Sequence, residues 1–176
     1  MNRQELEAMR RQKDQYFKAS PHSPLTPEQQ DKFTGLSYYD YNPDLVMDVT
    51  VEPVTDNHEI MLETTTDEVR RATRYGRFTF TVDGQEVSLT VYETQHGYFL
   101  PFTDANAGTE TYPAGRYLEP EELPDGRLHV DFNLAYNPFC AFNAGWSCPI
   151  TPPENRLNVA IRAGEKMPVG DWVEHE

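Results

Sequence analysis

The sequence has few lysines and a shortage of positive charge. Of its 176 residues four are lysine, and 15 basic residues stand against 29 acidic ones, which gives a formal net charge of -14. Proteins bind nucleic acids and anionic membrane surfaces largely through basic side chains that meet phosphate, so this deficit argues against both partners. An acidic, lysine-poor surface stays hydrated when salt screens its self-repulsion, so the composition predicts a halophilic, salt-accumulating host. The alternative is an ordinary acidic protein of a mesophile.

Long hydrophobic runs are also missing. No stretch approaches the roughly 18 consecutive apolar residues of a membrane span, and the first residues, MNRQELEAMRRQ, lack the apolar region of a secretory signal. We therefore expect a soluble, cytoplasmic protein. Domains most often have about 100 to 200 residues, and the chain contains no internal repeat or long linker. The expected organisation is one domain over residues 1–176, with a helical clasp at 1–36 on a β core at 45–165.

Metal ligands and thiols are scarce. Cys140 and Cys148 enclose seven residues, a spacing that matches no common zinc pattern because no second pair of ligands lies nearby. His129 and Asp131 resemble two ligands of a non-haem iron site, but a second histidine is lacking close to them, so we expect no metal and no cofactor. The two cysteines leave three interpretations open: two small buried hydrophobes, a structural or redox disulfide, or a reactive thiol. A reducing cytosol disfavours the disulfide.

Two short helices are expected near the amino terminus. Asn2 and Glu5 have the spacing of a capping box, and the helix they begin should end before Ser20. Thr26 is a suitable N-cap for a second helix, with Gln29 at its third position. Both helices are expected to fold over a later sheet, although their apolar face would also suit a partner.

From residue 45 onward the hydrophobic pattern has a period of two, which is typical of β strands. Asp83-Gly84 is a two-residue hairpin turn that pairs Phe80 with Val87. A turn at Asp56-Asn57 and a single helical turn at Thr66-Asp67 are also expected. The further strands are predicted at 46–54, 58–64, 98–102, 128–134 and 157–161. The fold class is therefore mainly β (α+β), an antiparallel β-barrel or sandwich with one or two N-terminal helices packed on it.

A polar row is predicted on one side of the strand at 128–134. His129, Asp131 and Asn133 alternate with the hydrophobic residues of this strand and so share the opposite face. The segment 131–155 that follows is rich in amides, aromatics and prolines and could cover that face. Such a covered polar row would line a pocket, whereas the plainer interpretation is that the asparagines brace irregular backbone.

Arg116 is the basic residue of greatest interest. Its neighbours Tyr112 and Tyr117 are aromatic, so its guanidinium would suit either a carboxylate or phosphate ligand or a structural acid such as Asp131. In the pocket hypothesis Arg116 binds an anionic group and Asp131 is the catalytic acid or base. The residues expected to orient the ligand or line the pocket are Tyr112, Asn133, Tyr136, Asn137, Cys140 and Asn155.

Several ordered motifs of the chain resemble a known family. GRYL at 115–118, DFNLAYNPFCAF at 131–142, CPITPPEN at 148–155 and AGEK at 163–166 are similar to the domain of unknown function 1684 family, as are SPHSPL and FTGLSYY near the amino terminus. The resemblance implies bacterial and haloarchaeal relatives and carries no established activity. The family motifs coincide with Arg116, Asp131, Asn133, Tyr136, Asn137, Cys140, Cys148 and Asn155.

Three functional hypotheses follow from these observations. The first is a small-molecule pocket, for binding or for catalysis, between the polar strand face and the 131–155 loop, with an anionic ligand held by Arg116. The second is a non-enzymatic structural or interaction module in which that loop is an ordered clasp. The third is a thiol redox switch formed by Cys140 and Cys148.

Overall fold

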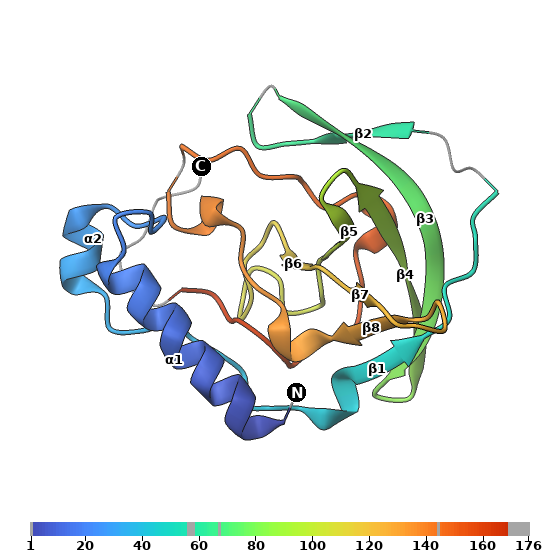
Figure 1. Cartoon of the computed structure of the whole chain (residues 1–176), viewed down its shortest axis with the longest axis horizontal. Helices are drawn as coiled ribbons and strands as arrows, with labels where there is room; N and C mark the ends of the chain where they lie inside the picture. Colours follow the sequence, from blue (N-terminus) through green and yellow to red (C-terminus); the bar gives the residue numbers. More distant parts are fainter. Residues whose placement is uncertain (1, 56–58, 67, 144, 169–176) are drawn as a thin grey trace.

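The computed structural model describes residues 2–55, 59–66, 68–143 and 145–168. Two α-helices come first, α1 at Arg3–Ala19 and α2 at Pro27–Lys32 (Figure 1). Both begin with the predicted capping boxes, in which Asn2 and Thr26 accept the backbone N–H three residues later. These reciprocal bonds satisfy amide groups that have no partner within the helix, which is why each helix begins where it does.

The rest of the described chain consists of strands of 2 to 14 residues, single 3-10 turns and irregular segments. The strands are β1 Val46–Val49, β2 Glu59–Glu63, β3 Val69–Val82, β4 Gln85–Thr94, β5 Gly97–Phe102, β6 Arg116–Leu118, β7 Glu121–Glu122 and β8 Leu128–Asp131. The 3-10 turns are η1 Pro43–Leu45, η2 Phe132–Leu134, η3 Phe139–Ala141 and η4 Pro153–Asn155.

The β3–β4 hairpin has the predicted register. Phe80 pairs with Val87 across the hairpin. Asp83 and Gly84 connect the strands with φ values of 51° and 78°, the two left-handed conformations of a tight hairpin turn. Turn chemistry and side-chain alternation select the same pairing, which is why the sequence specified it so firmly.

The strands form two antiparallel sheets that together surround the core. One sheet has the order β2-β3-β4-β5-β6 and is strongly curled, and the other has the order β1-β8-β7 (Figure 1). Two backbone bridges connect the sheets: Glu52, after β1, pairs with Arg77 of β3, and Tyr136, after β8, pairs with Tyr117 of β6. The arrangement is therefore closer to an incompletely closed barrel than to a flat sandwich, and the fold is α+β with antiparallel sheets, as predicted.

The main hydrophobic core fills the space inside these sheets. It includes Phe78 and Leu89 of the hairpin, Phe102 of β5 and Phe132 of η2. Phe132 stacks on Phe80 with 5.4 Å between ring centroids and meets Phe102 edge-on at 5.3 Å. These aromatic contacts join the two sheets across the barrel.

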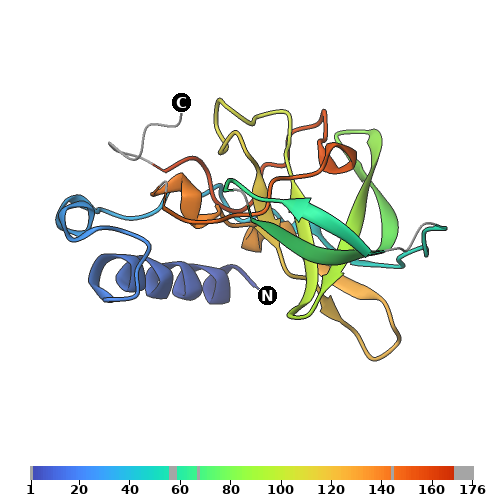
Figure 2. The same ribbon diagram turned by 90° about the horizontal axis from the view of Figure 1, so that it is seen from above.

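The helices lie beside the β sheets and contact them through the segment that follows β8. Figure 2 shows α1 and α2 on one side of the strands, with the chain around residue 140 between them. Phe17 of α1 packs edge-on against Phe142 at a centroid distance of 5.1 Å, within a second core cluster that contains Leu25, Phe33 and Ala141. Within the described residues no helix is long and apolar enough to cross a membrane.

Some predicted strands are shorter than expected or are absent. β1 ends at Val49, and β8 ends at Asp131 because the Asp131 carboxylate caps η2 by accepting the backbone N–H of Asn133 at 2.9 Å. The predicted strand at 157–161 is wrong: Val159 and Ile161 are buried, but the segment is an irregular strap over the barrel. His58, the Asp56-Asn57 turn and part of the Thr66-Asp67 turn lie outside the described residues.

Candidate functional site

Arg116 is enclosed by protein on all sides. Its side chain is 1% exposed, and its guanidinium donates to the backbone carbonyls of Ile161, Ala163 and Glu165 at 2.9, 2.5 and 3.0 Å. Gly115, with φ of +107°, places the arginine there, because a Cβ at this position would lie 2.7 Å from the carbonyl oxygen of Phe102. Arg116 therefore holds the carboxyl-terminal strap onto the barrel.

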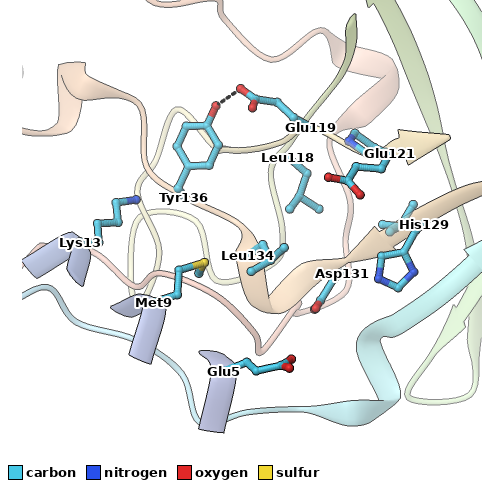
Figure 3. Close-up of a pocket in the computed structure, with 12 residues that line it drawn as sticks. Glu5, Met9, Lys13, Leu118, Glu119, Glu121, His129, Asp131, Leu134 and Tyr136 are labelled. Atoms are coloured by element: carbon cyan, nitrogen blue, oxygen red, sulfur yellow. Dashed lines mark hydrogen bonds between the residues drawn. The ribbon is translucent and has the colours of Figure 1, made fainter. Parts of the chain in front are cut away.

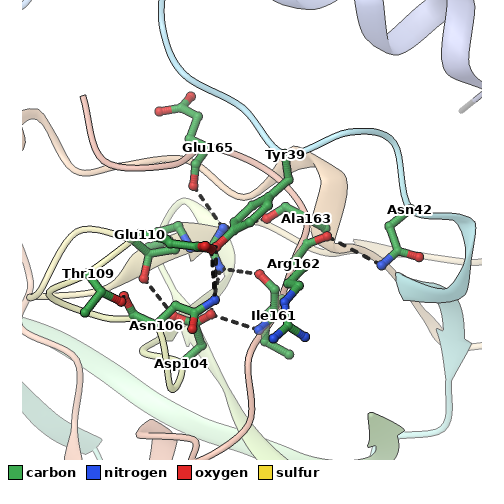
Figure 4. A network of polar contacts seen from close by, with 12 residues as sticks. Tyr39, Asn42, Asp104, Asn106, Thr109, Glu110, Ile161, Arg162, Ala163 and Glu165 are labelled. Atoms are coloured by element: carbon green, nitrogen blue, oxygen red, sulfur yellow. Dashed lines mark hydrogen bonds and ion pairs between the residues drawn. The ribbon is translucent and has the colours of Figure 1, made fainter. Parts of the chain in front are cut away.

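The carboxylate nearest to Arg116 belongs to Asp104 and not to Asp131. Asp104 Oδ2 lies 3.6 Å from the guanidinium and accepts the backbone N–H of Ile161 at 2.8 Å, while Oδ1 accepts the Thr111 hydroxyl at 2.7 Å (Figure 4). Burial lowers the pKa of the Arg116 guanidinium, and the charge of Asp104 opposes that shift. The expected Arg116–Asp131 pair is thus replaced by a pair that the sequence did not indicate.

Asn155 is another fully enclosed side chain. Its amide accepts the N–H of Thr90 at 2.8 Å and donates to the carbonyls of Thr90 and Pro101, each at 2.8 Å. All three contacts are with backbone of β4 and β5, so Asn155 fixes the 150–155 segment to the sheet. It does not line the groove described below.

Asn133 also binds backbone. Its Oδ1 accepts the N–H of Asn42 at 2.8 Å, and its Nδ2 donates to the carbonyl of Asn42 at 2.9 Å. The Asn133 side chain therefore binds both backbone polar groups of the residue that precedes η1. The same Nδ2 donates to Asp131 Oδ1 at 2.9 Å. Asn133 therefore positions Asp131 and the start of η1 together.

Asn137 lies at the contact between the 137–150 segment and the carboxyl-terminal strap. Its backbone N–H donates to Glu165 Oε1 at 3.1 Å, and its Nδ2 donates to the carbonyl of Lys166 at 2.9 Å. Glu165 is buried and forms an ion pair with Lys13 of α1. These contacts connect α1, the carboxyl-terminal strap and the 137–150 segment.

Cys140 and Cys148 form a disulfide, with their Cα atoms 6.5 Å apart. Of the three interpretations left open by the sequence, the structure therefore selects the disulfide. Thr65 donates its hydroxyl to the carbonyl of Trp146 and accepts the N–H of Cys148, so the disulfide loop is attached to the turn after β2. Tyr112 is buried in the same helix-facing cluster as Phe142.

A groove of about 570 Å³ lies between α1 and the strands β6, β7 and β8 (Figure 3). Two of the predicted site residues line it, Asp131 and Tyr136. The others do not: Tyr112, Arg116, Asn133, Asn137, Cys140, Cys148 and Asn155. Its position also differs from the prediction, because the cover over the strand face is α1 and not the 131–155 loop. The residues that line it are Glu5, Met9, Lys13, Leu118, Glu119, Pro120, Glu121, His129, Val130, Asp131, Leu134 and Tyr136.

Carboxylates outnumber the cations available in this groove. Lys13 is paired with Glu165, and His129 Nδ1 lies 2.7 Å from Asp48 Oδ1, so both basic side chains already have acidic partners. The Glu121 carboxylate makes no hydrogen bond or ion pair with any described residue. The groove therefore presents an excess of negative charge.

Tyr136 forms one wall of the groove. Its hydroxyl donates to Glu119 Oε1 at 2.6 Å. Burial raises the pKa of this hydroxyl, and the hydrogen bond to the Glu119 carboxylate raises it further. Tyr136 therefore stays a neutral donor that holds Glu119 in place.

Asp131 combines burial with an unused oxygen. Its side chain is 4% exposed, and Oδ1 accepts both the backbone N–H and the amide of Asn133. Oδ2 has no hydrogen-bond partner among the described residues. A buried polar atom without a partner is costly, so in a native protein such an atom is explained by strain, by a catalytic role or by a bound water, ion or other ligand.

The sequence did not indicate most groove residues. Glu5 and Met9 come from α1, four residues apart, and so face the same side. Glu121 is opposite His129 across β7 and β8. The amphipathic pattern of α1 did predict a packed face, but nothing in the sequence indicated which strand face that helix covers.

Comparisons with known proteins identify the family and a similar fold. No curated protein matches the chain significantly. Among solved structures, an uncharacterized protein of Haloarcula marismortui, determined by solution NMR, is 38% identical and has a TM-score of 0.68, with 93% of this chain and 92% of that chain covered. A haloarchaeal relative agrees with the halophile-like composition. The family model for proteins of unknown function DUF1684 matches residues 31–166. The chain therefore belongs to the DUF1684 family.

Proposed function

We propose that this protein binds a small organic cation in the groove between α1 and strands β6 to β8. The observation that carries the proposal is Asp131, a buried carboxylate that lines the groove and leaves Oδ2 without a partner in the described part of the chain. An ammonium or guanidinium group supplies both the positive charge and the hydrogen-bond donor that this oxygen lacks.

Other buried polar atoms support the choice of this position. Among the described residues, side-chain atoms without hydrogen-bond partners also occur in Arg10, Thr90 and Asn137. None of those three residues lines the groove, whereas Asp131 does. The expectation of an anionic ligand depended on Arg116, whose guanidinium is occupied by backbone carbonyls away from the groove.

The apolar part of the groove favours an organic cation over a bare metal ion. Leu118, Leu134 and Met9 lie between the carboxylates in Figure 3. These side chains can cover methylene groups, whose transfer out of water is favourable. The two leucines offer no ligand to a metal, and the Met9 thioether suits only soft ions. Because Oδ2 is itself covered, a donor reaches it only when neighbouring side chains shift slightly.

Thermal unfolding with small charged probes tests the proposal. An alkylammonium salt is expected to raise Tm in a saturable way, because a ligand that binds only the folded state stabilises it. The sodium salt of a carboxylate of the same chain length should not. In Asp131→Asn the alkylammonium effect should be lost, and in Glu86→Gln, which removes one exposed charge on β4, it should be kept. Equal shifts in all three proteins would overturn the proposal.

The disulfide supports a second candidate function, a redox-controlled clasp. A dithiol reductant would give two electrons and two protons to the Cys140–Cys148 bond, yielding two thiols while becoming a disulfide itself. The enclosed segment includes Phe142, which packs on Phe17 of α1, so reduction would loosen the attachment of the helix.

Free-thiol titration after treatment with dithiothreitol tests this candidate, together with the fluorescence of Trp146. Trp146 packs edge-on against Phe139 at 5.1 Å and should report a change in the loop. If two thiols appear without a change in fluorescence or in the stability of the helix layer, the switch is ruled out.

A further inference from the structure

We infer that the cation bound in the groove is an aliphatic diamine, held by Asp131 at one end and by Glu119 and Glu121 at the other. This inference rests on the proposed function and adds the identity of the ligand class. It follows from where the carboxylates lie along the groove.

The geometry of β7 and β8 places two carboxylates on the same face. Glu121 is directly opposite His129, and residues opposite each other in an antiparallel pair point to the same side. Asp131 follows His129 by two positions on β8 and so shares that side. Glu121 and Asp131 are therefore diagonal neighbours, with backbone positions separated by about 7 to 8 Å.

The floor between the two ends is apolar. In Figure 3 Glu119 and Glu121 lie at one end of the groove, Asp131 and Glu5 lie at the other, and Leu118 and Leu134 lie between them. A molecule with a charged amine at each end and methylene groups in the middle matches this order. A monoamine would leave the carboxylates at one end of the groove without a cationic partner.

Two carboxylates, those of Glu119 and Glu121, are available to bind a cation at the second end of the groove. The Glu119 carboxylate is held by the Tyr136 hydroxyl at 2.6 Å, and the Glu121 carboxylate has no hydrogen-bond or ion-pair partner within the described residues. Both carboxylates are exposed, so dissolved salt should weaken their attraction for a bound amine. Asp131 is buried, so its contribution should resist salt better.

Isothermal titration calorimetry of the full chain with three probes tests the inference: putrescine, n-butylamine and butanediol. Putrescine is expected to bind about ten-fold more tightly than n-butylamine, since the second charge adds a favourable contact. Butanediol, which has the same length and no charge, should not bind. Added salt should narrow the difference between the two amines without abolishing the binding of either.

Two variants separate this inference from the proposed function. Glu121→Gln should reduce the advantage of putrescine to within about two-fold of n-butylamine, while Asp131→Asn should weaken both amines. Glu86→Gln makes the same change in net charge as Glu121→Gln at an exposed position outside the groove and should leave both affinities unchanged.

The possible results are distinguishable. If both amines bind equally well and Asp131→Asn weakens both, the diamine inference is overturned and the cation site stands. If neither amine binds, both proposals are overturned. If putrescine binds equally to all variants and binding disappears with salt, the attraction is only that of a net charge of -14, and both proposals are again overturned.

Discussion

Two buried aspartates lie in different regions of the molecule, Asp104 beside Arg116 and Asp131 in the wall of the groove. Their side chains are almost equally buried, at 5% and 4% exposure. Asp104 uses both oxygens, accepting from Thr111 and from the backbone of Ile161. Asp131 uses only one. Burial alone therefore does not distinguish a structural carboxylate from a candidate site, whereas the count of unused lone pairs does.

The same comparison holds for the cations near each aspartate. Arg116 faces Asp104 and three backbone carbonyls, so its charge and its donors are matched within the fold. Asp131 has no cationic partner among the described residues, and the two basic groove residues are paired elsewhere. The Arg116 region is complete without a ligand, and the groove is the region where a ligand would complete the contacts.

The largest expected effect is the loss of Arg116. Arg116→Met should lower the free energy of unfolding by about 3 to 5 kcal/mol, because it leaves Asp104 as an unpaired buried charge and three carbonyls without donors. Denaturant unfolding measures this loss. Arg127→Met, in which the replaced arginine has only an exposed partner, Asp125, is the control and should change stability little. A small loss in Arg116→Met would mean that this region is not the structural one.

Asn155→Ala should cost about 2 to 4 kcal/mol, since it removes three hydrogen bonds and leaves backbone groups of Thr90 and Pro101 buried without partners. Asn158→Ala is a matched control, because Asn158 is exposed and its side chain accepts one hydrogen bond, from Gln85, within the described part of the chain. Both values come from denaturant curves. If the two variants were equally stable, Asn155 would be free to serve a ligand, and the pocket first expected under the 131–155 loop would regain support.

Reduction of the disulfide should have an intermediate effect. A short loop of this size constrains the unfolded chain by about 2.5 kcal/mol, so reduced protein or Cys140→Ser/Cys148→Ser should be less stable by that amount. Unfolding with and without a reductant measures it. Since the loop packs on Phe17, hydrogen exchange should also rise in the second half of α1. Unchanged exchange in α1 would separate the disulfide from the helix layer.

Local patterns account for what the sequence predicted well. The β3–β4 register depends on Asp83-Gly84 and on alternation within one hairpin, and the start of α1 depends on Asn2 and Glu5 alone. In each case the determining residues are neighbours in the chain. The family resemblance rested on several such local motifs and was confirmed.

The failures concern contacts between distant segments. Val159 and Ile161 alternate like a strand because the strap buries every second side chain, yet residues 157–161 form no ladder with any described strand. Arg116 donates to backbone carbonyls of the strap that lie more than 40 residues later in the chain, and α1 covers the β8 face from more than 100 residues away. Periodicity reports which side chains are buried, but it does not report which segment buries them.

The smallest expected change in stability is that of Asp131→Asn, and it tests most directly whether the groove differs from the Arg116 region. Asp131→Asn keeps the Oδ1 acceptor for Asn133 and replaces an oxygen without a partner, so the loss should be less than about 1 kcal/mol. Asp104→Asn, the matched variant, converts an acceptor used by Ile161 into a donor and should cost about 2 to 3 kcal/mol. Parallel denaturant curves give the difference directly. An equal loss in both variants would mean that Asp131 is as fully engaged in the fold as Asp104, and the groove would then lose the buried carboxylate on which the proposed cation site depends.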